Sequence, residues 1–255
     1  MSVLAARDLV IGYGSTMIAD RLAFDLSAGT VTCLLGPNGV GKTTLFKTLL
    51  GLLPKLAGSI RVGDAELASL SRPMLARHLA YVPQSYSADF AYTVLDLVVM
   101  GRTAHLGIFS TPTQPDVNIA LEMLDRLGIA ALAHHDARQL SGGQRQLVLI
   151  ARALAQQAKI IVMDEPTASL DLANRIQVLR KVRALADDGL SILLSTHEPE
   201  QAFAIADQVL ALGPDKQLET GPVDEVLTPE RLSHLYGVAL TVEKTPSGRH
   251  VVTAE

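Results

Sequence analysis

The chain has 255 residues, 48% of them hydrophobic, which is enough for one large domain with a substantial buried core. Its 22 Lys and Arg residues are outnumbered by 26 Asp and Glu residues, giving a formal net charge of -4. Nucleic-acid-binding proteins usually carry a basic surface, so this balance argues against nucleic acid as a partner.

The N-terminal residues lack the charged and apolar regions of a signal peptide, and no apolar run approaches the roughly 18 residues that span a bilayer. We therefore expect a cytoplasmic protein. The single cysteine, Cys33, lies in an apolar run, so we expect a buried core residue rather than a reactive thiol.

Short apolar segments dominate the first third of the chain and predict strands. They lie at residues 3–11, 22–26, 31–35, 59–62 and 79–82. The first two flank a turn with two glycines, which is typical of a β-hairpin. The third runs into a glycine-rich segment and is followed by helical spacing over residues 42–50.

Helical spacing replaces this pattern in the middle of the chain. Helices are predicted at 94–102, 117–127 and 145–155, the first of them after Thr93, a favourable N-cap. Strands at 160–163, 192–194 and 209–212 then alternate with helices at 172–185 and 200–206. Such alternation favours a parallel sheet with crossover helices. We therefore predict one α/β domain whose core comprises residues 1–87 and 157–255, with a helical lobe inserted at 88–156.

A phosphate-binding loop is predicted at residues 36–43, where Gly-Pro-Asn-Gly-Val-Gly-Lys-Thr matches G-x-x-x-x-G-K-[ST] at every fixed position. Glycines let successive backbone N–H groups surround phosphate oxygens, and the following helix adds the positive end of its dipole. Lys42 is predicted to contact the β- and γ-phosphates, and the Thr43 hydroxyl to bind Mg²⁺. The residues predicted to bind nucleotide here are Gly36, Pro37, Asn38, Gly39, Gly41, Lys42, Thr43 and Thr44.

Two carboxylates, Asp164 and Glu165, follow the apolar strand at 160–163. We expect this strand to lie beside the one that feeds the phosphate loop, with its end facing the phosphates. Asp164 would then hold Mg²⁺, and Glu165 would orient and polarise the attacking water. Two solvated carboxylates are the ordinary alternative at a strand end, but the phosphate loop favours the functional interpretation.

Residues 140–144, Leu-Ser-Gly-Gly-Gln, are identical to the signature sequence of ATP-binding-cassette (ABC) ATPases. Together with the phosphate loop they make nearly the whole chain resemble that family. A Ser and two glycines at a helix N-terminus form a second anion-binding nest. In the family this nest serves ATP bound by the partner, which implies a homodimer that sandwiches two ATP molecules. The residues implied to contact the partner's nucleotide are Ser141, Gly142, Gly143 and Gln144.

Further family segments occur in the expected order. Tyr13 stands where the family has an aromatic residue that stacks on adenine. Gln84 matches the glutamine that joins the Mg²⁺ site to the helical lobe, and Asp171 lies in the loop that crosses the dimer interface. His197 matches the switch histidine that reaches the γ-phosphate.

The resemblance implies an α/β P-loop NTPase (RecA-like) fold: a parallel sheet core with an antiparallel β subdomain and an inserted helical lobe. It implies ATP and Mg²⁺ as cofactors. The implied catalytic residues are Glu165, His197 and Gln84, and the implied metal ligands are Thr43, Gln84 and Asp164.

Residues 90–102 and His105 indicate the branch of the family. They resemble the ATPase subunits of importers for iron–siderophore complexes, haem and cobalamin, and those of molybdate and tungstate importers. The cargo does not touch this subunit in such transporters, so its identity stays open. The resemblance implies a homodimer bound to two copies of a membrane permease at the cytoplasmic face of the inner membrane, with a substrate-binding protein acting indirectly. Residues around 84–110 are predicted to form the groove for the permease.

ABC ATPases without a transport role are the main alternative. An iron–sulfur cluster assembly factor would have the same organisation, although residues 90–102 do not suit it. A DNA-maintenance ATPase would carry a long heptad insertion and a basic surface, and the sequence has neither. A GTPase or small-molecule kinase would leave the signature segment unexplained. No function is predicted for residues 241–255.

Overall fold

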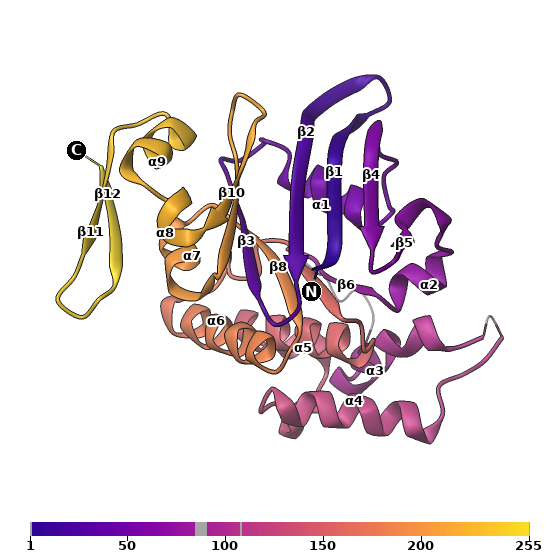
Figure 1. Ribbon diagram of the computed structural model, residues 1–255. Helices are drawn as coiled ribbons and strands as arrows, with labels where there is room; N and C mark the ends of the chain where they lie inside the picture. The colour runs from indigo at the N-terminus through magenta and orange to yellow at the C-terminus, as the bar shows by residue number, and fades with distance from the viewer. Residues whose placement is uncertain (1, 85–90, 108, 255) are drawn as a thin grey trace. The chain divides into compact units, whose positions relative to one another are not determined.

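The computed structural model describes residues 2–84, 91–107 and 109–254 (Figure 1). It divides into two compact units: unit 1 comprises residues 1–70 and 182–255, and unit 2 comprises residues 71–181. The predicted helical lobe begins at residue 88, and this residue and Phe90 lie outside the described residues. The lobe boundaries therefore stay a prediction. None of the helices in the described ranges is long and apolar enough to cross a membrane.

The antiparallel sheet of unit 1 begins with a long hairpin. β1 (Ser2–Tyr13) pairs with β2 (Thr16–Ser27), and β4 (Ala57–Val62) pairs with the other edge of β1. β5 (Ala65–Glu66) extends the sheet beyond β4. Buried and exposed residues roughly alternate along β1 and β2, as expected for a sheet with one face on the core. The predicted hairpin and antiparallel subdomain are confirmed.

The second sheet of unit 1 is mostly parallel. β3 (Val31–Leu35) pairs in parallel with β8 (Ser191–Thr196) on one edge and with β9 (Gln208–Leu212) on the other. β10 (Leu218–Pro222) adds to β9 in the antiparallel direction. All five residues of β3 are buried, as a central parallel strand requires. The prediction that the acidic strand lies directly beside β3 is wrong, because β8 and β9 occupy both of its edges.

Helices and a C-terminal hairpin complete unit 1. They are α1 (Lys42–Leu49), the 3₁₀ turn η1 (Leu67–Ser69), α7 (Pro199–Ile205), α8 (Val223–Val226), α9 (Pro229–Tyr236), β11 (Leu240–Lys244) and β12 (His250–Ala254). β11 and β12 form their own two-stranded sheet, which the sequence analysis did not predict.

Unit 2 contains a pair of parallel strands and a group of helices. The strands are β6 (Leu79–Val82) and β7 (Ile160–Met163). The helices and 3₁₀ turns are α2 (Arg72–Ala76), α3 (Val94–Val99), η2 (Met100–His105), α4 (Gln114–Arg126), η3 (Ala130–Leu132), η4 (Ala137–Gln139) and α5 (Gly142–Ala155), and α6 (Leu172–Asp187) begins in unit 2 and ends in unit 1.

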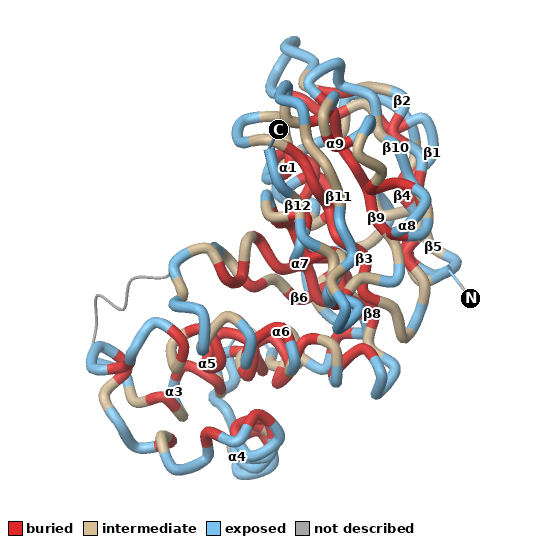
Figure 2. The backbone as a smooth tube through the Cα atoms, turned by 90° about the vertical axis from the view of Figure 1, so that its left-hand side faces the viewer, coloured by how far each residue is buried: buried red, intermediate tan, exposed pale blue. Residues whose placement is uncertain are grey.

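α5 forms the centre of the helical part of unit 2. Most of its residues are buried, and it packs against both α3 and α4 (Figure 2). The helix predicted at 94–102 ends early, at Val99, where the chain tightens into η2. η2 approaches α5 closely, since a Cβ at Gly101 would lie 2.1 Å from the carbonyl oxygen of Arg152.

Candidate active site

The phosphate loop joins β3 to α1 in unit 1, and its backbone geometry requires glycine. Gly41 has φ 120°, and a Cβ at Gly36 would lie 2.6 Å from the carbonyl oxygen of Leu212. Lys42 is only 6% exposed, and its ammonium donates to the carbonyl oxygens of Gly36 (2.7 Å) and Pro37 (3.1 Å). The loop therefore holds a positive charge at the N-terminal end of α1, where an anion is stabilised.

Tyr13 lies beside the first turn of α1. The Thr44 hydroxyl donates to the Tyr13 hydroxyl at 3.4 Å, and Tyr13 is 46% exposed. Thr43, Asn38 and Gly39 are also exposed. The structure thus brings the predicted adenine-stacking residue to the predicted phosphate loop, although the stacking role itself stays a prediction.

Asp164 directly follows β7 of unit 2 and is 5% exposed. Its backbone N–H donates to the carbonyl oxygen of Val82 at the end of β6 (2.9 Å). Burial, the charge of Asp164 and a hydrogen bond to Asp164 together raise the pKa of Tyr81 to about 12. Sequence reasoning did not identify Tyr81 as a neighbour of Asp164. The position of Tyr81, three residues before the predicted site residue Gln84, could have indicated it.

Glu165 has a backbone conformation that its residue type rarely adopts. Its φ of 44° lies in the left-handed region, which costs a non-glycine residue about 1–2 kcal/mol. Strain of this kind is concentrated at functional positions. The Gln84 side chain donates from Nε2 to Glu165 Oε2 at 3.2 Å. Two of the three predicted catalytic residues are therefore in contact.

The signature segment caps α5. The Ser141 hydroxyl accepts a hydrogen bond from the backbone N–H of Gln144 (3.3 Å), and the Gln144 side chain accepts one from the backbone N–H of Ser141 (3.0 Å). This capping box fixes the start of the helix. A Cβ at Gly143 would lie 2.3 Å from Asn174 Oδ1, so only glycine fits against α6 at this position. Gly142 is exposed and has more room, with Leu170 Cδ2 at 3.4 Å from its Cβ position.

Asn174 also holds Asp171. Asp171 accepts hydrogen bonds from the backbone N–H of Asn174 and from its side-chain amide, both at 2.8 Å. These two contacts lower the pKa of Asp171. Asn174 therefore links the signature segment to the predicted interface loop. Sequence reasoning did not assign Asn174 to the site.

His197 occupies the connection from β8 to α7 in unit 1 and is exposed. The Thr196 hydroxyl accepts a hydrogen bond from the backbone N–H of Glu198 (3.1 Å). The hydroxyl of Tyr236 donates to the carbonyl oxygen of His197 (2.9 Å). The loop is therefore held on both sides of the histidine.

A groove of about 1100 Å³ lies in unit 2, within the predicted permease-docking region. α2, α3, η2 and the segment after η2 line it, and many of its side chains are apolar. Among the lining residues are Pro73, Ala76, Leu95, Val99, Met100 and Leu106. Met100 is 40% exposed, so a large apolar side chain is available at the groove surface.

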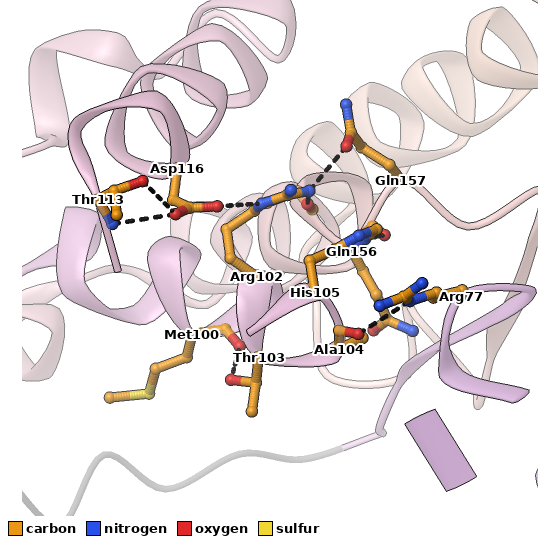
Figure 3. A network of polar contacts seen from close by, with 11 residues as sticks. Arg77, Met100, Arg102, Thr103, Ala104, His105, Thr113, Asp116, Gln156 and Gln157 are labelled. Atoms are coloured by element: carbon orange, nitrogen blue, oxygen red, sulfur yellow. Dashed lines mark hydrogen bonds and ion pairs between the residues drawn. The ribbon is translucent and has the colours of Figure 1, made fainter. Parts of the chain in front are cut away.

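A buried ion pair joins η2, which lines this groove, to α4 (Figure 3). Arg102 donates from Nε to Asp116 Oδ1 at 3.0 Å, and from Nη1 to the carbonyl oxygen of Ala155 and to Gln157 Oε1, both at 2.8 Å. The backbone N–H of Thr113 and the Arg102 guanidinium together lower the pKa of Asp116 to about 2. Arg102 and Asp116 are 6% and 8% exposed. η2 is thereby fixed to the C-terminal end of the signature helix.

Gln156 extends this network towards β6. Its side-chain amide donates to the carbonyl oxygens of Ala76 and of Leu79, the latter at 2.8 Å. His105 Nε2 lies 2.8 Å from the carbonyl oxygen of Gln156, and the Arg77 side chain donates to Ala104 at 3.1 Å (Figure 3). The groove is thus connected to the strand that leads to Gln84.

A glycine loop between a parallel strand and a helix, ending in Lys-Thr, and a second apolar strand ending in Asp-Glu define the P-loop NTPase class. Within that class, the family model described as ABC transporter matches residues 19–168, more than half of the chain. The chain belongs to the ABC transporter family, and it is an ATP-binding ATPase of that family.

Individual relatives support this assignment. An ABC transporter ATP-binding protein of Haemophilus influenzae is 44% identical over 234 residues, covering 92% of this chain and 89% of its own length. The molybdate import ATP-binding protein MolC of the same organism is 40% identical over 217 residues, covering 85% of this chain and 80% of its own length. A solved inward-facing structure of a metal-chelate type ABC transporter matches with a TM-score of 0.89 at 35% identity, covering 100% of this chain and 99% of that chain.

Proposed function

We propose that this chain is the nucleotide-binding subunit of an ABC importer and that a homodimer of it hydrolyses ATP at two sites. The observation that carries the proposal is that one chain has two glycine-rich helix N-termini, each of a kind that suits a phosphate group. One is the phosphate loop at 36–43, and the other is the glycine nest behind Ser141. A single bound ATP has one γ-phosphate and does not need both.

The residues at the predicted metal site suit Mg²⁺. Thr43 offers a hydroxyl, Asp164 a carboxylate and Gln84 an amide oxygen, and Mg²⁺ prefers oxygen ligands with few carboxylates and substrate phosphates. Because the Gln84 amide nitrogen donates to Glu165, the amide oxygen is the atom that Gln84 presents to a cation. When bound, Mg²⁺ neutralises charge on the β- and γ-phosphates.

Hydrolysis requires a positioned water and a stabilised γ-phosphate. Glu165 orients the water and draws on its proton while the water oxygen attacks the γ-phosphorus and the bond to the β,γ-bridging oxygen breaks, which yields ADP and phosphate. Gln84 holds the Glu165 carboxylate by the hydrogen bond described above. Lys42 and His197 stabilise the charge on the phosphate oxygens.

The signature nest is proposed to act on the partner's ATP. The Ser141 hydroxyl accepts from Gln144 as an N-cap, and a hydroxyl can donate its own proton at the same time. Capping the helix and donating to a phosphate are therefore compatible. Asp171, held by Asn174, is proposed to lie in the loop that crosses the dimer interface.

The groove of unit 2 is proposed to receive a helix of a membrane permease, which brings the dimer to the cytoplasmic face of the membrane. Two permease copies and an external substrate-binding protein would complete the importer. The similarity to a molybdate import protein and to a metal-chelate type transporter favours molybdate or a metal chelate as cargo. The cargo is expected to pass through the permease without touching this chain.

Co-purification with the membrane proteins encoded beside this chain tests the proposal. We expect a polytopic permease to bind and to change the ATPase rate. Thr103→Arg in the groove should abolish that binding, whereas Leu121→Arg on the exposed side of α4, outside the groove, should not. Capture of a soluble scaffold with no permease would contradict the importer and favour a non-transport role, such as iron–sulfur cluster assembly.

A further inference from the structure

The C-terminal part of unit 1, in which residues 241–255 had no predicted function, contacts the loop that carries His197. Tyr236 is the last residue of α9, and its hydroxyl donates to the carbonyl oxygen of His197 at 2.9 Å. We propose that Tyr236 is a positioning residue for His197 and that α9 and the β11–β12 hairpin together brace the His197 loop. The inference rests on the proposed role of His197 in hydrolysis.

The His197 loop is short and is anchored at both ends. All six residues of β8 before it are buried, and α7 begins at the buried Pro199. The Thr196 hydroxyl donates to Gln201 Oε1 at 3.1 Å and accepts from the backbone N–H of Glu198. Tyr236 adds a contact from a segment 39 residues further along the chain, made directly to the peptide group of His197.

Tyr236 is itself held in place by the packing of α9. Leu232 and Leu235 on this helix are 1% and 6% exposed. Gly237 ends the helix in the left-handed conformation, with φ 71°. The backbone N–H of Leu240, the first residue of β11, donates to the Ser233 hydroxyl at 2.9 Å. Helix and hairpin therefore form one connected element.

The same element also holds α7, the helix that follows His197. The His250 ring stacks on Phe203 with ring centroids 4.2 Å apart and an interplanar angle of 20°. The backbone N–H of Val252 donates to Glu200 Oε1 at 3.2 Å. β12 therefore contacts α7 (Figure 2), and the His197 loop is restrained at its own peptide and along the helix that continues from it.

A restraint on the His197 peptide acts on the orientation of its side chain and not on nucleotide binding. The groups proposed to hold the phosphates are the phosphate loop and Lys42, and Lys42 is positioned by the carbonyl oxygens of Gly36 and Pro37 and not by Tyr236. Correct placement of a catalytic group lowers the barrier of the chemical step. Loss of the Tyr236 hydroxyl should therefore reduce kcat and leave KM for ATP unchanged.

Tyr236→Phe removes the hydroxyl and keeps the ring. In the full-length protein with Mg-ATP we expect kcat to fall about 3- to 10-fold, the size expected for one hydrogen bond, with unchanged KM. In the His197→Ala background the same substitution should cause no further loss, because residues that act through one another are not additive. Thr241→Val, which removes a hydroxyl that contacts Thr253 in the hairpin, is the matched control and should retain wild-type kcat.

Two results would contradict the proposal that Tyr236 positions His197. One is a wild-type kcat in Tyr236→Phe, and the other is an equal loss of kcat from Tyr236→Phe in the presence and absence of the His197 side chain. Equal thermal melting of Tyr236→Phe and Thr241→Val shows that the fold is intact in both. Normal turnover by His197→Ala alone would instead overturn the proposed role of His197, so the two failures are distinguishable.

Discussion

The phosphate loop of unit 1 and the groove of unit 2 are held in shape by different parts of the polypeptide. In the loop, backbone geometry decides, because a Cβ at Gly36 would clash with the carbonyl oxygen of Leu212 and Gly41 has a positive φ. In the groove, side chains decide, because Arg102 and Asp116 tie η2 to α4 and α5. A backbone-defined site depends on a contiguous run of residues, whereas a side-chain-defined site depends on pairs separated in sequence. Substitutions in the phosphate loop and in the groove should therefore have different effects: single substitutions should impair the loop, and the effect of a groove substitution should depend on its partner residue.

The largest effect is expected at Glu165. Glu165→Gln keeps an oxygen that can accept from Gln84 but removes the carboxylate that draws on the water proton, so kcat should fall about 100- to 10,000-fold. ATP should still bind, and the closed dimer should accumulate. Single-turnover hydrolysis and nucleotide-binding titration measure the two effects separately. Turnover at the wild-type rate would show that Glu165 does not position the water.

Two alanine substitutions test whether backbone contacts define the phosphate loop. Gly36→Ala places a Cβ 2.6 Å from the Leu212 carbonyl oxygen, so the loop must shift, and ATP affinity should fall at least about tenfold. Gly39→Ala would bring its Cβ within 4 Å of no other atom, so only its unfavourable φ of 81° opposes the substitution. ATP affinity should therefore fall less in Gly39→Ala than in Gly36→Ala. Equal affinities of the two variants, measured by calorimetry, would contradict this account of the loop.

The groove should respond to pairs of substitutions. Arg102→Met leaves Asp116 buried without its guanidinium partner, so Tm should fall by about 5–10 °C. Arg102→Met combined with Asp116→Leu replaces the pair by apolar groups and should recover most of the loss. Thermal melting followed by circular dichroism measures both variants. A double variant less stable than the single one would show that the ion pair is not the dominant contact.

A smaller effect concerns pH. The pKa of Asp116 is lowered to about 2 in the folded protein, from an ordinary value of 3.8 in the unfolded chain. A lowered carboxyl pKa stabilises the fold above the unfolded value, and that contribution is lost as pH falls through the folded value. Between about pH 4 and pH 2, the wild type should therefore lose stability more steeply than the paired Met–Leu variant. Urea unfolding at a series of pH values measures the free energy of unfolding of both proteins. If this free energy fell equally steeply with pH in the wild type and the variant, Asp116 would not have this role.

Sequence reasoning was strongest where a few contiguous residues determine the structure. The strand, glycine loop and helix at 31–49 follow from local apolar spacing and backbone freedom, and the structure has them. The β1–β2 hairpin follows from two apolar runs around a glycine turn. Local sequence did not determine strand order, because the strand beside β3 comes from residues 191–196, far along the chain.

Contacts between distant residues account for the rest. Arg102 and Asp116 are 14 residues apart, and Tyr236 and His197 are 39 apart, with nothing in either segment to indicate the partner. The hairpin at the C-terminal end has no alternation of buried and exposed residues, since every residue of β11 and β12 is partly or fully exposed. These features become visible only when the fold places the segments together.

The central claim is that Ser141 of one subunit acts on ATP held by Lys42 of the other, and a complementation assay tests it most directly. Homodimers of Lys42→Ala and of Ser141→Arg should each be inactive, the first because it does not bind ATP and the second because its nest is blocked. Mixing the two proteins should restore ATPase activity, because one site of each mixed dimer combines an intact phosphate loop with an intact nest. No activity in verified mixed dimers would contradict the claim, since each chain would then serve only its own nucleotide.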